Sequence, residues 1–321
     1  MIKIYKSHND ILEKKPFVIG ENLEIEKLTE KNTWIHLLNP TEDEIRTITS
    51  AFEIPDEHIR AALDDEEKAR LEIDDGMVLV IIDVPMHSTE NRCSFTTMPL
   101  GIILLNDNII TVSTTKFSLI EEFINGKIKS FYTYKKIRFI LQLLFRNSTY
   151  FLYYLKQIGR ISDSVEKHLK ESMRNEELML LLELEKSLVY FTTSLKSNEA
   201  VLERMMRTEI VKKYPDDLEL LEDVIIETKQ AIEMANIYYS ILGGTRDAFS
   251  SVISNNMNEV MKKLTLITIV FAIPTIISGL WGMNVPGIPF EKNLNGFYIV
   301  LGIAVLLGLV LAWVLFRKEK Y

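Results

Sequence analysis

The chain ends in two long stretches that lack charged side chains. No Asp, Glu, Lys or Arg occurs between Lys263 and Glu291, and none occurs between Lys292 and Arg317. A bilayer core about 30 Å thick is crossed by roughly 20 apolar helical residues, so each stretch is long enough to span it. The predicted membrane region covers 263–321, with spans at about 264–283 and 296–316 joined by a turn at 284–295.

Residues 1–125 contain short apolar segments separated by helix starts. The apolar segments are rich in β-branched residues, and turn formers bound most of them, which is typical of strands. They are Ile2 to Tyr5, Trp34 to Leu38, Met77 to Asp83, Leu100 to Leu105 and Ile109 to Val112. Acidic residues after Pro40 and Pro55 mark the first turns of two helices. We therefore expect a mixed α/β domain at 1–125.

Helical periodicity dominates residues 126–262, where apolar residues recur mostly at spacings of three and four between charged ones. This pattern predicts two long antiparallel helices, Lys135 to Ser172 and Asn175 to Ile210. A third helix forms a stalk at 216–262 and continues into the first span, since no stop signal precedes that span. The alternative is two helices broken at Gly243-Gly244, because each glycine costs a helix about 1 kcal/mol relative to alanine.

The 321 residues carry a formal net charge of −8, which argues against nucleic acid as a partner because phosphates require an excess of Lys and Arg. The chain has no glycine-rich phosphate loop, so no nucleotide is expected, and its five histidines lack ligand spacing. No enzyme site is therefore predicted. The single cysteine, Cys93, excludes a disulfide framework. Clusters such as Asp64-Asp65-Glu66-Glu67 either attract cations or form solvated helix faces.

Basic residues flank the two spans on one side. Lys262 and Lys263 precede the first span, and Arg317, Lys318 and Lys320 follow the second, whereas the turn holds one acidic and one basic residue. Positive flanks favour the cytoplasmic side. The charged N-terminus does not resemble a signal peptide. We therefore expect a multi-pass protein of the cytoplasmic membrane with both termini in the cytoplasm and the turn outside.

The two spans differ in pattern. Residues 301–316 are apolar all round, which suits a helix that faces lipid. The first span instead carries small or polar groups along one stripe, at steps mostly of three or four. The stripe comprises Asn258, Met261, Leu264, Thr268, Ala272, Thr275, Gly279 and Asn284. Such a stripe faces a partner helix or a water-filled path, and the residue types alone leave both readings open.

The segment from Gly279 to Asn284 follows a proline-bearing helix and precedes a short turn and a final helix with a basic tail. In this setting, Gly282-Met283-Asn284 resembles the signature of the CorA family of magnesium transporters, and the similarity in layout covers the whole chain. The resemblance implies a funnel-shaped homopentamer in the lipid bilayer, with five first spans around a central pore. It implies transport of Mg²⁺, with Co²⁺ and Ni²⁺ as further candidates, driven by the membrane potential.

The resemblance also assigns positions along the pore. The pore-lining positions are Asn258, Met261, Leu264, Thr268, Ala272 and Thr275. Met261 and Leu264 would form an apolar constriction that blocks ions by dewetting. Five Asn284 side chains would ring the outer mouth, where their amide oxygens can accept hydrogen bonds from Mg²⁺ that keeps its water. Familiar members carry a bulkier residue at the level of Ala272, so a second constriction there lacks support.

In the family that the chain resembles, intracellular Mg²⁺ closes the pore by bridging acidic residues of neighbouring subunits. Asp223, on the stalk, matches the aspartate position of that regulatory metal site. Its partner is expected in the loop Met86 to Thr97, where this sequence offers only Glu90. Asp223 could also be an ordinary surface charge.

Two alternatives to magnesium transport remain at this point. A zinc transporter of the same fold would share the tripeptide, although no histidine or cysteine near the pore favours a borderline metal. A membrane-anchored sensor or scaffold with a coiled-coil stalk would carry no ions and would not depend on Asn284.

Overall fold

The computed structural model describes residues 1–8, 11–15, 28–74, 76–88, 94–172, 175–209, 211, 214–283, 285–290 and 293–318. The chain divides into two compact units, Met1–Arg246 and Asp247–Tyr321, and each is described by itself. The first unit holds a β-sheet and long helices, and the second holds the end of one long helix followed by a final apolar helix.

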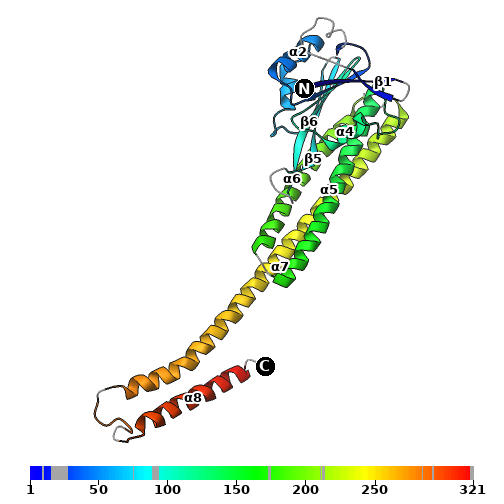
Figure 1. Ribbon diagram of the computed structural model, residues 1–321. Helices are drawn as coiled ribbons and strands as arrows, with labels where there is room; N and C mark the ends of the chain where they lie inside the picture. The colour runs from blue at the N-terminus through cyan, green and yellow to red at the C-terminus, as the bar shows by residue number, and fades with distance from the viewer. Residues whose placement is uncertain are drawn as a thin grey trace. The chain divides into compact units, whose positions relative to one another are not determined.

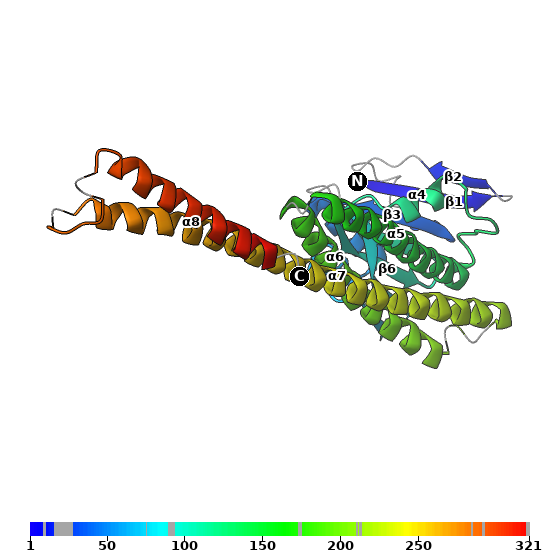
Figure 2. The same cartoon turned by 90° about the horizontal axis from the view of Figure 1, so that it is seen from below.

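A seven-stranded sheet lies at the centre of the first unit (Figures 1 and 2), with the spatial order β2-β1-β3-β7-β6-β5-β4. The strands are β1 Ile2–His8, β2 Ile11–Lys15, β3 Thr33–Leu38, β4 Arg70–Asp74, β5 Met77–His87, β6 Phe95–Leu105 and β7 Ile109–Ser113. β3 and β7 pair in parallel, and the other described pairs are antiparallel. The five predicted strands are confirmed, whereas the edge strands β2 and β4 were not predicted.

Helices cover both faces of the sheet. On one face, α2 (Glu42–Phe52) and α3 (Asp56–Ala61) pack through isoleucines onto the sheet. Both predicted helix starts are confirmed, and a capping box at Thr41 begins α2. Gly101 of β6 permits the close approach of α3, since a Cβ there would lie 2.4 Å from the Cβ of Ala62. The other face carries a larger core that includes α4 (Ser118–Ile124) and the long helices.

The hairpin of β5 and β6 corrects the expectation of a loop from Met86 to Thr97. The two strands stay paired from Met77 and Leu105 out to His87 and Phe95, so the connection between them is much shorter than predicted. A Ser88 N–H donates to the Ser94 carbonyl at 2.8 Å just beyond the last strand pair. Glu90 lies outside the described residues.

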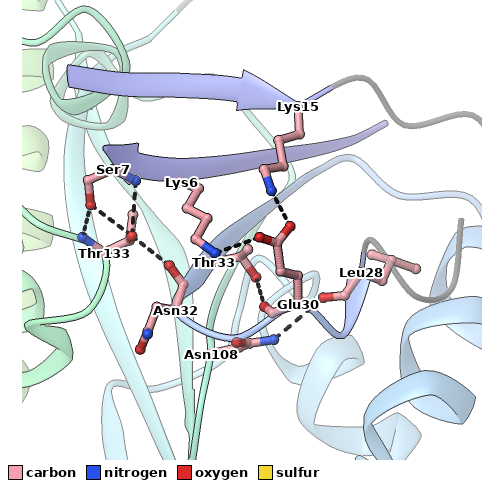
Figure 3. A network of polar contacts seen from close by, with 9 residues as sticks. All are labelled: Lys6, Ser7, Lys15, Leu28, Glu30, Asn32, Thr33, Asn108 and Thr133. Carbon is pink, nitrogen blue, oxygen red and sulfur yellow. Dashed lines mark hydrogen bonds and ion pairs between the residues drawn. The ribbon is translucent and has the colours of Figure 1, made fainter. Parts of the chain in front are cut away.

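A polar network fastens the N-terminal hairpin of β1 and β2 to the rest of the unit (Figure 3). The Glu30 carboxylate accepts hydrogen bonds from Lys6, at 2.5 Å, and from Lys15. These two lysines hold the pKa of the Glu30 carboxyl below its ordinary value. Beside them, the Ser7 N–H donates to the Thr133 hydroxyl at 3.1 Å. The edge of the sheet is therefore held by side chains from segments far apart in sequence.

Three long helices follow the sheet: α5 (Lys136–Ser172), α6 (Asn175–Arg207) and α7 (Pro215–Trp281). The two predicted antiparallel helices and the start of the third are confirmed. α5 and α7 approach closely, because a Cβ at Gly159 would come within 2.8 Å of the Tyr238 ring. Near the end of the first unit, Arg246 of α7 donates to both carboxylate oxygens of Glu185 on α6, at 2.9 and 2.7 Å. The stalk is thus held to α5 by packing and to α6 by an ion pair.

α7 is one continuous helix of 67 residues, which at 1.5 Å per residue corresponds to about 100 Å of helix. Gly243 and Gly244 lie inside it, so the alternative of a break at these glycines is wrong. Pro274 also lies inside the helix.

In the second unit, α8 (Gly296–Lys318) runs antiparallel beside the end of α7 (Figure 1). The two helices are in contact at Gly308, where an added Cβ would lie 3.4 Å from Cγ of Pro274. Ala304, one turn before Gly308, is only 5% exposed. Small residues at four-residue spacing allow two membrane helices to pack closely, and α8 uses them in this way.

Candidate ion path

The end of α7 presents two different faces. One face is partly covered within the second unit and consists of Leu266, Val270, Ile273, Pro274, Ile277 and Trp281. The contact of Pro274 with Gly308 identifies α8 as the element that covers it. These residues recur every three or four positions, so they form one continuous strip along the helix.

The predicted stripe lies on the opposite side of α7. At about 100° per residue, its members cluster roughly half a turn away from the covered face. All of the described stripe residues are exposed in the single chain: Asn258, Met261, Leu264, Thr268, Ala272, Thr275 and Gly279. Met261 and Leu264 are 52% and 55% exposed, although both are large and apolar. The stripe therefore faces away from α8.

The threonine hydroxyls on the stripe are bonded to the helix itself. Thr268 Oγ1 donates to the Leu264 carbonyl at 2.9 Å, and Thr275 Oγ1 donates to the Phe271 carbonyl at 2.9 Å. Each hydroxyl proton is thereby used inside the helix, while the oxygen keeps lone pairs for a further donor. Water around a hydrated cation supplies such donors, so the stripe can solvate a hydrated ion without further rearrangement.

At its C-terminal end, α7 stops at Trp281 and the chain turns. Gly282 N–H donates to the Ser278 carbonyl at 2.9 Å, and Met283 N–H donates to the Leu280 carbonyl at 3.4 Å. A Cβ at Gly282 would lie 3.2 Å from the same Ser278 oxygen, which is a tight contact and suits glycine. Asn284, the third residue of the tripeptide, lies outside the described residues.

Trp281 anchors the turn, and the sequence pattern did not single it out for this role. Its indole Nε1 donates to the Pro289 carbonyl at 3.1 Å, and its ring lies 6.4 Å from that of Phe297. Gly296 is required where α8 starts, because a Cβ there would lie 2.3 Å from the Phe290 carbonyl oxygen. The segment after the tripeptide is therefore held against both helix ends.

Just before the predicted span, an ion pair lies on the opposite side of α7 from the stripe. Glu259 and Lys263 lie 2.7 Å apart, four residues apart on α7, and both are exposed. The Lys263 ammonium holds the pKa of the Glu259 carboxyl below its ordinary value. Because both groups face solvent, the pair contributes little to stability.

Asp223, the residue predicted to bind a regulatory metal, lies on the surface of α7. The neighbouring residues Leu221 and Val224 are buried, whereas the Asp223 side chain is exposed. Its carboxylate has no partner among the described residues. Within the part of one chain that the structure describes, no group of three or more His, Cys, Asp or Glu could hold a metal. A metal site that uses Asp223 would need ligands from elsewhere, and Glu90 falls outside the described residues.

Asp83 is a half-buried titratable group that sequence reasoning missed. Asp83 lies on β5 beyond the last residue that pairs with β4. There the Asn198 side chain binds the Asp83 backbone in place of a neighbouring strand. It accepts a hydrogen bond from the Asp83 N–H at 2.9 Å and donates one to the Asp83 carbonyl at 2.8 Å. Burial raises the pKa of the Asp83 carboxyl to about 6, and the Ser194 hydroxyl offsets this only in part. No apolar or motif signal in the sequence distinguishes this aspartate from a surface one.

Two helices in the described chain are long and apolar enough to cross a membrane, namely α7, through its C-terminal part, and α8. One carries a polar stripe on its uncovered face, and the other is apolar throughout. An α/β domain, a long stalk helix and this two-helix hairpin together define the class of two-span membrane proteins that transport ions.

The chain belongs to the CorA-like Mg²⁺ transporter protein family, whose profile matches residues 29–318. Among its relatives, the cobalt/magnesium transport protein CorA of Methanocaldococcus jannaschii is 28% identical over 300 residues, which are 90% of each chain. The magnesium transport protein CorA of Campylobacter jejuni is 23% identical and is matched over 100% of both chains. These relatives are named as transport proteins, in agreement with the expectation that the chain is not an enzyme.

Solved structures share the fold. The complete structure of the CorA magnesium transporter from Methanocaldococcus jannaschii superposes with a TM-score of 0.80 at 24% identity, covering 98% of this chain and 96% of the other. The full-length CmaX protein gives a TM-score of 0.72 at 15% identity, covering 100% and 97%. The expected fold class, an α/β domain followed by long helices and two apolar helices, is confirmed.

Proposed function

We propose that five copies of this chain form a channel that carries Mg²⁺ across the cytoplasmic membrane, with α7 lining the pore and α8 outside it. The observation that carries this proposal is the exposed stripe of α7, which faces away from α8 and ends at Gly282-Met283. A membrane helix that turns threonines and an asparagine away from its only described neighbour in the span needs a polar environment on that side. We propose Mg²⁺ as the transported cation because the relatives are named as transport proteins for magnesium or for cobalt and magnesium.

The outer mouth selects the ion through Asn284. Mg²⁺ is small and gives up its water reluctantly. A ring of neutral amide oxygens accepts hydrogen bonds from the water shell without removing it. A ring of carboxylates would hold the divalent ion more strongly, whereas conduction requires that the ion also leave. Gly282 and Met283 shape the turn that presents the amides.

The gate lies further in, at Met261 and Leu264. In a five-fold arrangement these exposed apolar side chains converge, and a narrow apolar constriction excludes water and therefore ions. Asn258 forms a polar ring at the inner mouth, while Thr268, Ala272 and Thr275 line the path between. No ATP is needed, because a divalent cation moving down 100 mV gains about 4.6 kcal/mol.

Cytosolic Mg²⁺ also acts as the brake, so the ion is both cargo and regulator. Asp223 fits such a site in its exposure, its lack of a partner among the described residues and its hard carboxylate oxygens, which suit Mg²⁺. Its second ligand would come from the neighbouring subunit, and Glu90 is the acidic residue expected there. Mg²⁺ bound between subunits would hold the stalks in the arrangement that closes the gate.

Both termini lie in the cytoplasm in this proposal. The basic residues Lys262, Lys263 and Arg317 flank the inner ends of the spans, as the positive-inside rule requires. The membrane region is 263–321, with spans at about 264–283 and 296–316. The α/β domain at 1–125 and the long helices at 126–262 then extend into the cytoplasm.

Two other functions are less well supported. A zinc transporter is not favoured, because the relatives are named for magnesium or for cobalt and magnesium. The ZntB cytoplasmic domain shares 13% identity with this chain, which is a likeness of fold alone. A membrane-anchored sensor or scaffold is not favoured by membership of a transporter family.

The test is ion flux into liposomes that contain the full-length protein. We expect a membrane potential that is negative inside the liposome to drive Mg²⁺ uptake by the wild type. Asn284→Ala should abolish this uptake, while size-exclusion chromatography with light scattering should show that the oligomer remains intact. Zn²⁺ flux without Mg²⁺ flux would establish the zinc alternative. The absence of any divalent flux from the wild type would favour the sensor.

A further inference from the structure

The contact between α7 and α8 brings basic residues on two helices to one level. Pro274 lies beside Gly308. From there, Lys263 is 11 residues back along α7 and Arg317 is 9 residues forward along α8, which are about 16 and 14 Å of helix. Because the helices are antiparallel, both residues lie at the same end of the pair, and Lys262 precedes Lys263 in the sequence.

The opposite end of the pair is aromatic. Trp281 and Phe297 lie there with ring centroids 6.4 Å apart, and Tyr298 packs on Phe297 at 5.5 Å. Lys263 and Trp281 are 18 residues apart, or about 27 Å along α7. That separation is close to the thickness of a bilayer core, about 30 Å. The basic end and the aromatic end therefore sit at two different membrane surfaces.

At the basic end, one cation is held over an aromatic ring. The Arg317 guanidinium lies 5.0 Å from the centre of the Trp313 ring, one turn earlier on α8, and Trp313 is 62% exposed. Tryptophan prefers the boundary between lipid tails and headgroups. An arginine on such a ring is fixed at headgroup depth with its bidentate donors available for a phosphate, although an arginine in water would be mobile.

The charges around these residues favour an anion. Between residues 248 and 290 the only carboxylate is Glu259, and α8 contains none. Glu259 pairs with Lys263, but this pair is exposed, with side chains 59% and 54% accessible, so a stronger acceptor can replace it at small cost. Lys262, Lys263 and Arg317 together outnumber the single acid three to one.

We propose that Lys262, Lys263, Arg317 and Trp313 form a binding surface for the headgroup of an anionic phospholipid of the inner leaflet. The phosphate takes the Arg317 guanidinium beside Trp313, on the side of α8 turned away from α7, and the acyl chains lie along the apolar side of α8. Lys262 and Lys263 add positive charge at the same depth. This inference rests on the proposed function only for the topology, because it requires that α7 and α8 cross the bilayer with this end inside.

Native mass spectrometry of the full-length protein in mixed micelles tests the surface. The micelles contain equal amounts of phosphatidylglycerol and phosphatidylcholine. Each basic residue near an anionic surface is worth about a fivefold change in binding. We therefore expect the wild type to retain phosphatidylglycerol over phosphatidylcholine, and the Lys263→Gln, Arg317→Gln double variant to lose most of that preference.

A matched control separates this surface from charge in general. Lys186→Gln removes a lysine that lies 5.7 Å from the Tyr190 ring on α6, in the first unit. It should leave the lipid preference unchanged, and the double variant should still be an intact oligomer. Equal retention of both lipids by the wild type, or an unchanged preference in the double variant, would overturn the proposal.

Inorganic phosphate distinguishes a lipid site from a free anion site. In phosphatidylcholine micelles, phosphatidylglycerol should raise the Tm of the wild type and millimolar phosphate should not; equal stabilisation by phosphate would overturn the assignment to lipid. Mg²⁺ flux is measured on the same preparations. Normal flux without a lipid preference would sink this inference alone, while a lipid preference without any flux would instead contradict the proposed transport function.

Discussion

The two membrane helices of this chain differ in the residues on the face that does not contact the other helix. α8 contains no Ser, Thr, Asn or Gln, and its small residues Ala304 and Gly308 face α7. α7 carries Thr268 and Thr275 on a face that α8 does not cover, with Asn258 on the same line. Both helices are apolar enough to span a membrane. They differ in which polar groups they carry and in where those groups lie on the helix.

This comparison shows how one chain can serve two environments. A helix surrounded by lipid and by one partner needs only apolar residues and a few small ones for packing. A helix that faces water on one side and protein on the other needs a stripe of groups that can accept hydrogen bonds. The threonine hydroxyls donate to backbone carbonyls of α7, so their protons stay hydrogen-bonded when no water is beside the stripe. The free energy that they lose without water is therefore small.

The largest expected effect comes from the outer end of α7. Asn284→Ala removes the amide ring, so Mg²⁺ flux into liposomes should fall to background. Asn293→Ala, in the same outer turn, is the matched control, because its side chain only accepts from the Asn295 N–H at 3.3 Å. Loss of flux in both variants would assign the effect to the turn as a whole and not to the tripeptide.

The next effect distinguishes the gate from the lipid face. Leu264→Ser makes the constriction polar, and lowering its barrier by about 1.4 kcal/mol would raise Mg²⁺ flux in high internal Mg²⁺ about tenfold. Leu309→Ser makes the same change on α8, where the leucine is 67% exposed. It should leave flux unaltered. Equal leaks through both variants would mean that the two helices do not differ as proposed.

A smaller effect concerns the N-terminal part of α7, which lies before the predicted span. Asp223→Lys removes the regulatory carboxylate, so the internal Mg²⁺ concentration that halves the flux should rise, by about fivefold if the coupling is at the low end of allosteric values. Protection from proteolysis by millimolar Mg²⁺ should weaken in parallel. Glu222→Lys changes an exposed acid one position earlier, on a different side of the helix, and should shift neither measurement. An unchanged midpoint in Asp223→Lys would remove this residue from the site.

The smallest expected change in flux comes from removing a single hydroxyl group. Thr268→Val keeps the shape of the side chain and loses one acceptor, so flux should fall by about twofold, which corresponds to a fraction of a hydrogen bond. Val305→Thr adds a hydroxyl to α8, where the valine is 50% exposed, and should have no effect on flux. A larger loss from Val305→Thr than from Thr268→Val would reverse the assignment of the two helices.

Much of the fold follows from the sequence pattern. The five central strands were predicted because each is a short run of apolar, β-branched residues. The edge strands β2, Ile11–Lys15, and β4, Arg70–Asp74, were missed because three of the five residues in each are charged. Edge strands bury only part of their surface and use charge to avoid further pairing, so apolar patterning does not mark them.

The site was predictable to a different degree. The stripe on α7 is a local pattern of one helix, so spacing alone identified it. The face that α8 covers depends on a contact between residues 34 positions apart, Pro274 and Gly308, and no spacing rule gives such a contact. The same holds for the Asn198 bonds to Asp83, which join helix and strand across 115 positions. The proposed pair of Asp223 and Glu90 would form between two subunits, and a pattern along one chain does not identify a contact between chains.

The claim that α7 faces water and α8 faces lipid can be measured directly by thiol accessibility. Cys93 is the only cysteine, so Cys93→Ser provides a background free of thiols. Thr275→Cys on α7 and Val305→Cys on α8 are then exposed separately to a hydrophilic, membrane-impermeant thiol reagent in liposomes. Because the reagent attacks the thiolate, which forms only in water, Thr275→Cys should react about tenfold faster or more, and its modification should block Mg²⁺ flux. Equal rates at both positions, or flux unchanged by modification at Thr275→Cys, would contradict the account.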